Sequence, residues 1–167
     1  MLIFTTIFKA FPAMKPFTTC LWFDGNAEEA AGFYVSVFKN SKMGEVQRNS
    51  TDNPGGKKNS VLLVNFTLNG QQFMALNGGP NFKFNKAVSF VVHCETQDEI
   101  DYYWEKLIAN GGQPVQCGWL KDRFGLSWQI VPANLGKLIA GANSAKVMTA
   151  LMQMIKFNIA ELEAASQ

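Results

Sequence analysis

The chain has 167 residues, of which 47% are hydrophobic, 17% charged and 13% aromatic. This length predicts one compact domain or two small modules, and the composition excludes a disordered chain. Fifteen basic residues against thirteen acidic ones leave a net charge of +2. We expect no nucleic-acid partner, because this excess is too small for a surface that follows phosphates. A single histidine, His93, argues against metal sites built from several imidazoles.

The cysteines and the N-terminus bear on the cellular compartment. Cys20, Cys94 and Cys117 form no C-x-x-C pair, and an odd number does not suit a disulfide framework, so we expect a cytoplasmic protein. No membrane partner is expected, since no apolar run reaches the roughly 18 residues that span a bilayer. We set residues 1–15 apart as an N-terminal extension. Its first thirteen residues could precede the natural start at Met14, form an additional strand, or be a cleaved signal.

The sequence contains a weak internal repeat at an offset of 70 residues, since position 20 aligns with position 90. In each copy a strand-length apolar run, at 20–23 and 90–93, precedes a helix whose apolar residues recur at i, i+3, i+4, i+7 and i+8. Asn26 and Thr96 are the expected caps of the two helices. Asn40 and Asn110 are expected to end them.

Each expected helix is followed by three short strands. In the first copy we expect strands at 42–48, 61–68 and 71–76, with Asn69-Gly70 as a tight hairpin turn. In the second copy we expect them at 113–116, 119–121 and 126–131. Beyond the repeat, Ser144 is the expected cap of a helix that runs to Lys156, and Asn158 caps a shorter helix at 159–164.

Three separated runs carry a closer resemblance: LWFDGNAEEAAGFY at 21–34, FMALNGGP at 73–80 and CGWLKDRFGLSWQ at 117–129. They are similar to the PhnB-like branch of the vicinal oxygen chelate superfamily, often labelled 3-demethylubiquinone-9 3-methyltransferase-like. The superfamily includes glyoxalases, bleomycin resistance proteins and extradiol dioxygenases. The resemblance covers residues 16–165. It implies an α+β fold in which two βαβββ modules, at about 16–80 and 86–140, form a curved sheet around a central cleft, with C-terminal helices at 141–167.

The resemblance also allows a test for cofactors. The metal ligands of metal-bearing relatives correspond to positions near 17–19, to Met74, to positions near 87–89 and to Gln129, which gives a set such as Thr19, Met74, Ser89 and Gln129. Only the last has a side chain that suits a divalent cation, which favours carboxylates or imidazoles, so we expect no metal. The open alternative is an unusual ligand set that includes Asp24, His93 or Asp122. S-adenosylmethionine is also not expected, because each glycine pair, at 55–56, 78–79 and 111–112, reads as a turn.

Strand alternation predicts which side chains face the cleft. The expected ligand-binding set is Trp22, Met74, Leu76, Trp119, Ser127 and Gln129, with Phe82 and Phe84 near the mouth. An apolar lining with a few amide and hydroxyl groups favours a small, flat organic molecule. The alternative is that these side chains only fill space.

We therefore expect a metal-independent protein that binds a small organic molecule and forms a homodimer. Its apolar C-terminal stripe could pack on the sheet of its own chain or on a second subunit. The alternative is an enzyme of unknown reaction, either a glyoxalase- or dioxygenase-like lyase or oxidoreductase, or the methyltransferase of the family label. Its weak catalytic candidates are Asp24, His93 and Cys117. A structural or interaction role stays open as a third interpretation.

Overall fold

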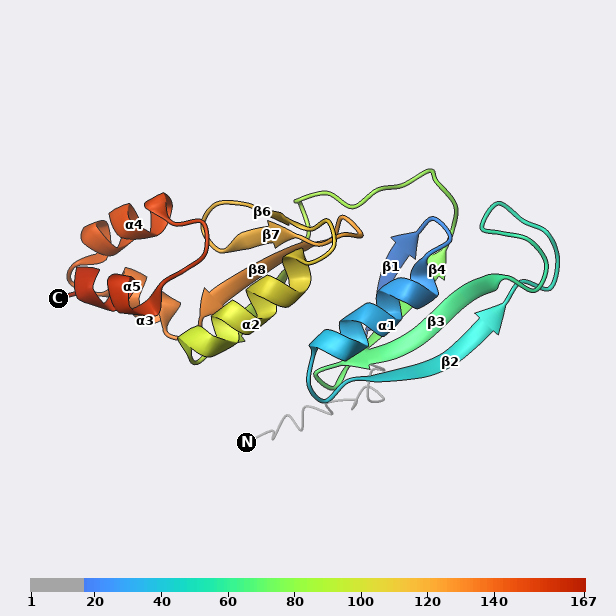
Figure 1. The fold of residues 1–167 in the computed structure, drawn as a ribbon, viewed down its shortest axis with the longest axis horizontal. Coiled ribbons are helices and arrows are strands. Elements are labelled where there is room, and N and C mark those ends of the chain that lie inside the picture. The colour runs from blue at the N-terminus through green and yellow to red at the C-terminus, as the bar shows by residue number, and fades with distance from the viewer. Residues whose placement is uncertain (1–16) are drawn as a thin grey trace, which may run out of the picture.

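Two four-stranded mixed sheets form the body of the protein in the computed structural model, which describes residues 17–167 (Figure 1). The first sheet has the order β1-β4-β3-β2 and the second has the order β5-β8-β7-β6. In each sheet the first strand pairs in parallel with the last, and the other pairs are antiparallel. The strands are β1 (Thr19–Phe23), β2 (Lys42–Arg48), β3 (Val61–Leu68), β4 (Gln71–Asn77), β5 (Phe90–Cys94), β6 (Gln113–Pro114), β7 (Trp119–Lys121) and β8 (Ser127–Pro132).

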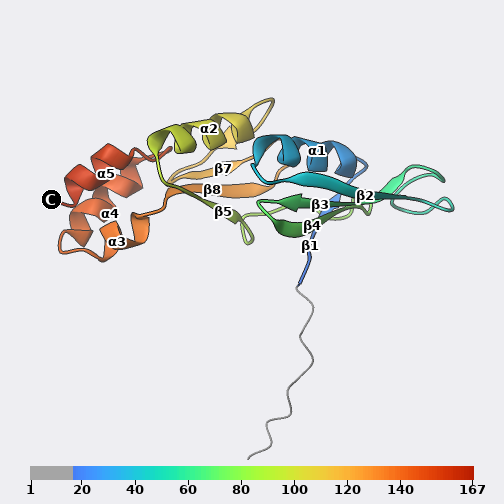
Figure 2. The same cartoon turned by 90° about the horizontal axis from the view of Figure 1, so that it is seen from below.

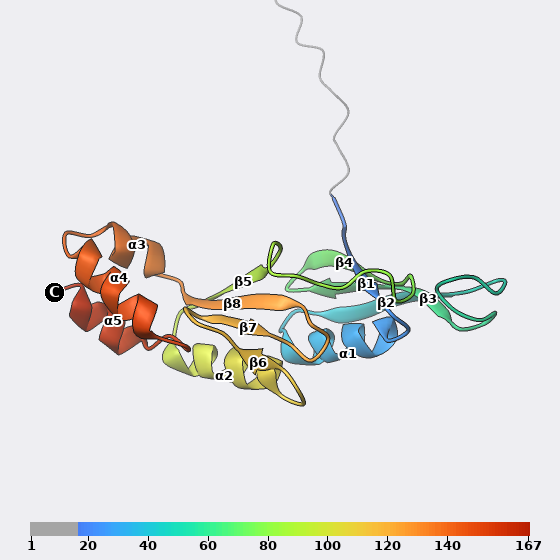
Figure 3. The ribbon, with the colours of Figure 1, turned by 90° about the horizontal axis from the view of Figure 1, so that it is seen from above.

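One helix follows the first strand of each sheet, α1 (Ala27–Val37) and α2 (Gln97–Ile108). The predicted duplication of a βαβββ unit and the α+β class are therefore confirmed. Both helices lie on the same side of the sheets (Figures 2 and 3). The sequence also led us to expect sheets that curve around a central cleft. Instead the sheets are open and uncurled, and no further layer within residues 17–167 covers the face opposite the helices.

Short-range signals in the sequence explain the start of α2 but not that of α1. The Thr96 side chain accepts a hydrogen bond from the Glu99 backbone N–H at 3.2 Å, as predicted. The Asn26 side chain makes no capping bond. Instead Asn77, at the end of β4, accepts from the Ala27 N–H at 2.9 Å. The first helix is therefore capped from its own sheet, by a residue 50 positions away.

The two modules are joined by buried and partly buried aromatic rings and one buried carboxylate. The Asp122 carboxylate accepts hydrogen bonds from Tyr34 Oη at 2.9 Å and Trp128 Nε1 at 2.8 Å. It also accepts from two backbone N–H groups of its own hairpin, those of Phe124 and Leu126. Ring centroids of Phe38 and Trp128 lie 5.1 Å apart, and those of Phe73 and Phe90 lie 5.4 Å apart. We call this cluster the module joint: Tyr34, Phe38, Phe73, Phe90, Asp122 and Trp128.

Three helices follow the second sheet: α3 (Leu135–Ala140), α4 (Ser144–Gln153) and α5 (Ile159–Ala165). The expected helix from Ser144 ends three residues before Lys156. It ends there because the carbonyls of Met154 and Ile155 accept from the N–H groups of Cys117 and Gly118, both at 2.8 Å. α3 was not predicted: its six residues make less than two turns, and its apolar residues Leu135 and Leu138 are only partly buried. Asn158 caps α5, as expected.

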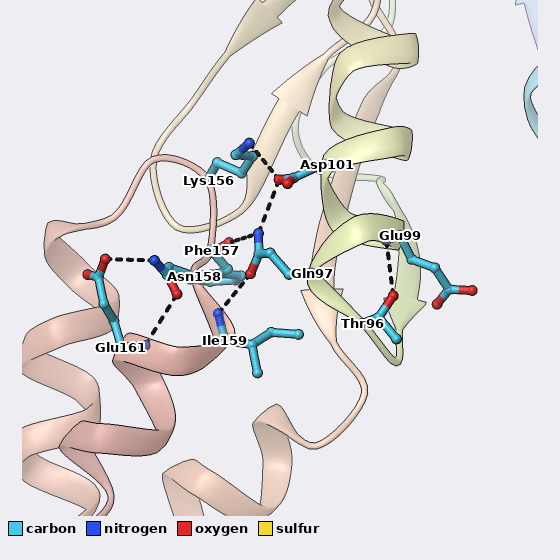
Figure 4. A network of polar contacts seen from close by, with 9 residues as sticks. All are labelled: Thr96, Gln97, Glu99, Asp101, Lys156, Phe157, Asn158, Ile159 and Glu161. Carbon is cyan, nitrogen blue, oxygen red and sulfur yellow. Dashed lines mark hydrogen bonds and ion pairs between the residues drawn. The ribbon is translucent and has the colours of Figure 1, made fainter.

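Side chains of α2 hold this C-terminal segment in place (Figure 4). Gln97 Nε2 donates to the Phe157 carbonyl at 3.1 Å, and Gln97 Oε1 accepts from the Ile159 N–H at 3.0 Å. Lys156 Nζ forms an ion pair with Asp101 at 2.6 Å. We call these five residues the C-terminal clamp: Gln97, Asp101, Lys156, Phe157 and Ile159.

Two expectations concern the chain ends and membranes. The N-terminal extension at 1–15, including the three interpretations of its first thirteen residues, lies outside the described residues. Among residues 17–167, none of the helices has the length and apolar character needed to cross a bilayer.

Candidate functional site

The six predicted cleft residues lie on the sheet face opposite the helices, in two groups. Trp22 and Leu76 are register partners on β1 and β4, beside Met74. Trp119 and Gln129 are register partners on β7 and β8. The sixth residue, Ser127, lies two positions before Gln129 on the same strand. Strand alternation therefore placed each group on one face, while the open sheets keep the two groups on separate modules.

A pocket of about 480 Å³ lies where the two modules meet. Its walls are formed by the end of β1, the segment that links the modules, and the β7–β8 hairpin. Trp22 and Asp24, both singled out from the sequence, lie in its wall. We call it the junction pocket. Its lining residues are Trp22, Phe23, Asp24, Asn26, Phe82, Lys83, Phe84, Lys121, Phe124 and Gly125.

The Trp22 ring is held in place on three sides. Its Nε1 donates to the Gly79 carbonyl at 2.9 Å. The Phe82 ring meets it edge-on, with centroids 5.0 Å apart. A Cβ on Gly78 would lie 2.1 Å from the indole ring, so only glycine permits this approach. The glycine pair at 78–79, which the sequence suggested was a turn, thus also shapes the pocket wall.

The junction pocket carries an excess of positive charge. Lys83 and Lys121 line it together with a single carboxylate, Asp24. The ion pairs found among residues 17–167 involve none of these three groups. Their charges are therefore available to a ligand in the pocket. Sequence spacing could not have found this set, because Lys121 comes from the second module and Asp24 from the first.

A smaller hollow of about 250 Å³ continues from the junction pocket and shares Lys83 and Phe84 with it. Its other lining residues are mostly apolar: Thr19, Cys20, Leu21, Asn85, Val88, Phe90 and Leu126. Burial raises the pKa of the Cys20 thiol. The hollow therefore offers an apolar surface rather than a reactive thiolate.

The three catalytic candidates lie in different places. Asp24 lines the junction pocket, while His93 lines another hollow of about 360 Å³ between the β3–β4 turn and β5. Cys94, next to His93, is buried on the opposite face of the strand. Its burial, and to a smaller extent the negative charge of Glu99, raises the pKa of its thiol to about 12. Cys117 Sγ lies 3.8 Å from Met152 Sδ. These positions give no shared nucleophile and base.

The residues at the metal positions implied by the resemblance do not fit a divalent cation. Gln129 Nε2 donates to Ser89 Oγ at 2.8 Å, and Met74 contributes a thioether. The carboxylate of Asp122 already accepts four hydrogen bonds in the module joint. Among residues 17–167, no three His, Cys, Asp or Glu side chains gather as a metal site would require.

The glycine pairs likewise do not fit a glycine-rich cofactor loop. Asn53 and Gly56 form an isolated bridge, and Gly111, with φ of 112°, follows the end of α2. Gly78 accommodates the Trp22 ring. Because each pair has such a local role, these residues do not form the strand-to-helix turn that binds S-adenosylmethionine in most methyltransferases.

Solved structures share the paired βαβββ modules, and two comparisons show the family to which the chain belongs. A family model described as 3-demethylubiquinone-9 3-methyltransferase matches residues 15–131. A putative 3-demethylubiquinone-9 3-methyltransferase, PhnB protein, from Bacillus cereus is 39% identical with a TM-score of 0.64, over 71% of this chain and 100% of that chain. The chain therefore belongs to the PhnB-like, 3-demethylubiquinone-9 3-methyltransferase-like family.

More distant structures share the fold. Protein PA1353 from Pseudomonas aeruginosa is 18% identical with a TM-score of 0.57, over 70% of this chain and 96% of that chain. The fosfomycin resistance protein FosX from Listeria monocytogenes, solved with Mn(II) and sulfate, is 14% identical with a TM-score of 0.51, over 75% of this chain and 95% of that chain. No curated protein matches this chain.

Proposed function

We propose that this protein binds a small organic molecule without a metal, in the junction pocket and on the adjoining open sheet face. The main observation behind the proposal is that the Trp22 ring in the pocket wall is held in one position by its contacts with Gly78, Gly79 and Phe82. A ring fixed before binding loses little conformational freedom when a flat ligand packs against it. Around it the pocket combines apolar surface with a few polar groups, as small-molecule sites do.

The side chains available favour binding over catalysis. The positions that would hold a metal carry a thioether, hydroxyls and an amide, so neither a metal nor S-adenosylmethionine is part of the proposal. Asp24, His93 and Cys117 line no common pocket. An enzyme that uses these three residues together therefore receives no support from their arrangement.

We further propose that the protein acts as a homodimer in the cytoplasm. Large apolar side chains near the open face stay exposed, with Phe17 at 89%, Val88 at 67% and Val91 at 46%. Exposed large apolar side chains are candidates for an interaction surface, and a second copy on the open face would also enclose the bound molecule. The three cysteines are free, which is consistent with a reducing compartment.

Native mass spectrometry of the full chain, purified without added metal, tests both parts of the proposal. The expected result is a metal-free dimer that retains a small organic adduct or takes up added 1-naphthol. Trp22→Leu should weaken 1-naphthol uptake about tenfold, because it removes the fixed ring. Met148→Leu, an exposed residue on α4, is the matched control and should leave uptake unchanged.

Either of two results would contradict the proposal. A measured mass that includes about one metal ion per subunit would contradict metal-independent binding. Uptake of 1-naphthol that is equal in the parent protein and in Trp22→Leu would show that the junction pocket is not the binding site.

A further inference from the structure

We propose that the junction pocket selects aromatic monoanions, meaning planar ring systems with a single carboxylate or phenolate, and that Lys83 and Lys121 provide the counter-charge. This inference rests on the proposed function and adds the chemical class of the ligand. It depends on three features of the pocket: the position of its rings, the origin of its charges, and the apolar hollow that continues from it.

The rings offer an aromatic surface on which a planar group can pack. Trp22 and Phe82 meet edge-on at 83°, so the edge of one ring approaches the face of the other. Behind them Phe23 and Phe84 also pair edge-on, with centroids 5.4 Å apart. Phe82 is 66% exposed, although exposed phenylalanine is unfavourable in water. A flat ligand packed against Phe82 and Trp22 would cover this surface with the offset or edge-on geometry that aromatic groups prefer.

The charges come from both modules and favour an anion. Lys83 belongs to the segment that links the modules and Lys121 to β7, and both residues line the pocket. Neither takes part in an ion pair among the described residues. Asp24 offsets one of the two charges. The resulting excess of one positive charge matches a ligand with one negative charge, whereas the second charge of a dianion would meet the Asp24 carboxylate.

The adjoining hollow sets the expected size of the ligand. It continues from the junction pocket past Lys83 and Phe84 and is bordered by Leu21, Val88 and Leu126. A second fused ring or an alkyl substituent could extend into it while the anionic group stays near the lysines. We therefore expect bicyclic aromatic acids to bind more tightly than benzoate, because they cover more apolar surface.

Calorimetric titration of the full chain with three probes of equal ring size tests the proposal. These are 1-naphthoate (one negative charge), 1-naphthylmethanol (neutral) and naphthalene-1,4-dicarboxylate (two negative charges). At low salt, 1-naphthoate should bind roughly tenfold more tightly than either of the others, and raising the salt should reduce its advantage over the alcohol. Lys83→Met and Lys121→Met should each lower the ratio of naphthoate to alcohol affinity several-fold.

Matched variants separate charge selection from binding itself. Lys146→Met, an exposed lysine on α4, should leave the ratio of affinities as it is in the parent protein. Gly78→Ala places a methyl group where the Trp22 ring lies, so it should weaken all three probes together.

The outcomes distinguish the two proposals. Equal affinities for naphthoate and the alcohol, or a ratio that both lysine variants leave unchanged, would overturn anion selection. If binding in that case still depends on Gly78, the proposed function stands. A failure of all three probes to bind would overturn both.

Discussion

The protein has two internal joints that differ in chemistry. The module joint is buried and aromatic, and its one carboxylate, Asp122, is 1% exposed and accepts four hydrogen bonds. The C-terminal clamp combines backbone carbonyls with polar side chains, and its ion-paired side chains Lys156 and Asp101 are 36% and 39% exposed. Buried polar groups are costly to leave unpaired, whereas half-exposed ones can turn to water.

This difference predicts a hierarchy of stability. The family match ends at residue 131, so α3, α4 and α5 lie beyond it. We expect the two modules to unfold together, since the module joint ties α1 to the second sheet. The C-terminal helices should open before them, although Phe157 and Leu162 are buried.

The largest expected effect comes from Asp122→Ala. This change leaves the Tyr34 hydroxyl, the Trp128 indole N–H and two backbone N–H groups without their acceptor, so we expect a loss of about 4 kcal/mol in the free energy of unfolding. Urea denaturation measures it. The exposed carboxylate of Asp52 provides the control, and Asp52→Ala should leave the free energy of unfolding nearly unchanged. A loss for Asp122→Ala as small as that of the control would show that the joint does not depend on its carboxylate.

Gln97→Ala should have a smaller and more local effect. It removes hydrogen bonds to Phe157 and Ile159, at a cost of about 1.5 kcal/mol. Hydrogen exchange should accelerate in α5 more than in β3. If exchange accelerates equally in both elements, the C-terminal helices and the modules form one cooperative unit and the proposed hierarchy is wrong.

The pH dependence of stability provides a third comparison. Burial raises the pKa of Asp122 above its usual 3.8, and this effect outweighs its hydrogen bonds, which act in the opposite direction. The folded state therefore binds this proton more tightly than the unfolded state. As a result, the contribution of Asp122 is fully present below pH 3.8 and falls as pH rises through the raised value. Denaturation at a series of pH values should show this component in the parent protein but not in Asp122→Asn. The same slope in both proteins would rule out Asp122 as its source.

The smallest expected effect is that of Lys156→Met. A hydrogen bond from the Lys156 ammonium group, and a weaker effect of Gln97, lower the pKa of Asp101. The ion pair therefore stabilises the folded state at pH values above the ordinary Asp pKa. This contribution is lost as the pH falls through the lowered pKa. Because both side chains are more than a third exposed, we expect at most about 0.5 kcal/mol, decreasing with salt. Thermal denaturation at low and high salt measures it. A loss in the free energy of unfolding for Lys156→Met close to that for Asp122→Ala would show that the C-terminal clamp is no weaker than the module joint.

Much of the fold could be predicted because its signals are local. The β2 and β3 strands begin and end where the sequence indicated, and Asn69-Gly70 forms the expected turn with positive φ at both residues. Asn40 and Asn110 also adopt positive φ after their helices. α3 was missed because its apolar pattern, Leu135, Leu138 and Ile139, covers less than two turns, which is too short to identify a helix.

The candidate site was less accessible to such reasoning. Alternation along β4 correctly separated buried Phe73 and Ala75 from more exposed Met74 and Leu76. It could not show that Trp22, Lys83 and Lys121 line one pocket, because they come from the first sheet, the linking segment and the second sheet.

The sequence therefore determined the duplicated βαβββ order, the tight turns, the α2 cap and the family, all of which depend on neighbouring residues or contiguous runs. Tertiary structure alone decided the openness of the sheets, the capping of α1 by Asn77, and the burial of Asp122 against Tyr34, 88 positions away. The physical reason is that these features require groups distant in the chain to meet. Their meeting depends on how the two modules pack, which no local pattern encodes.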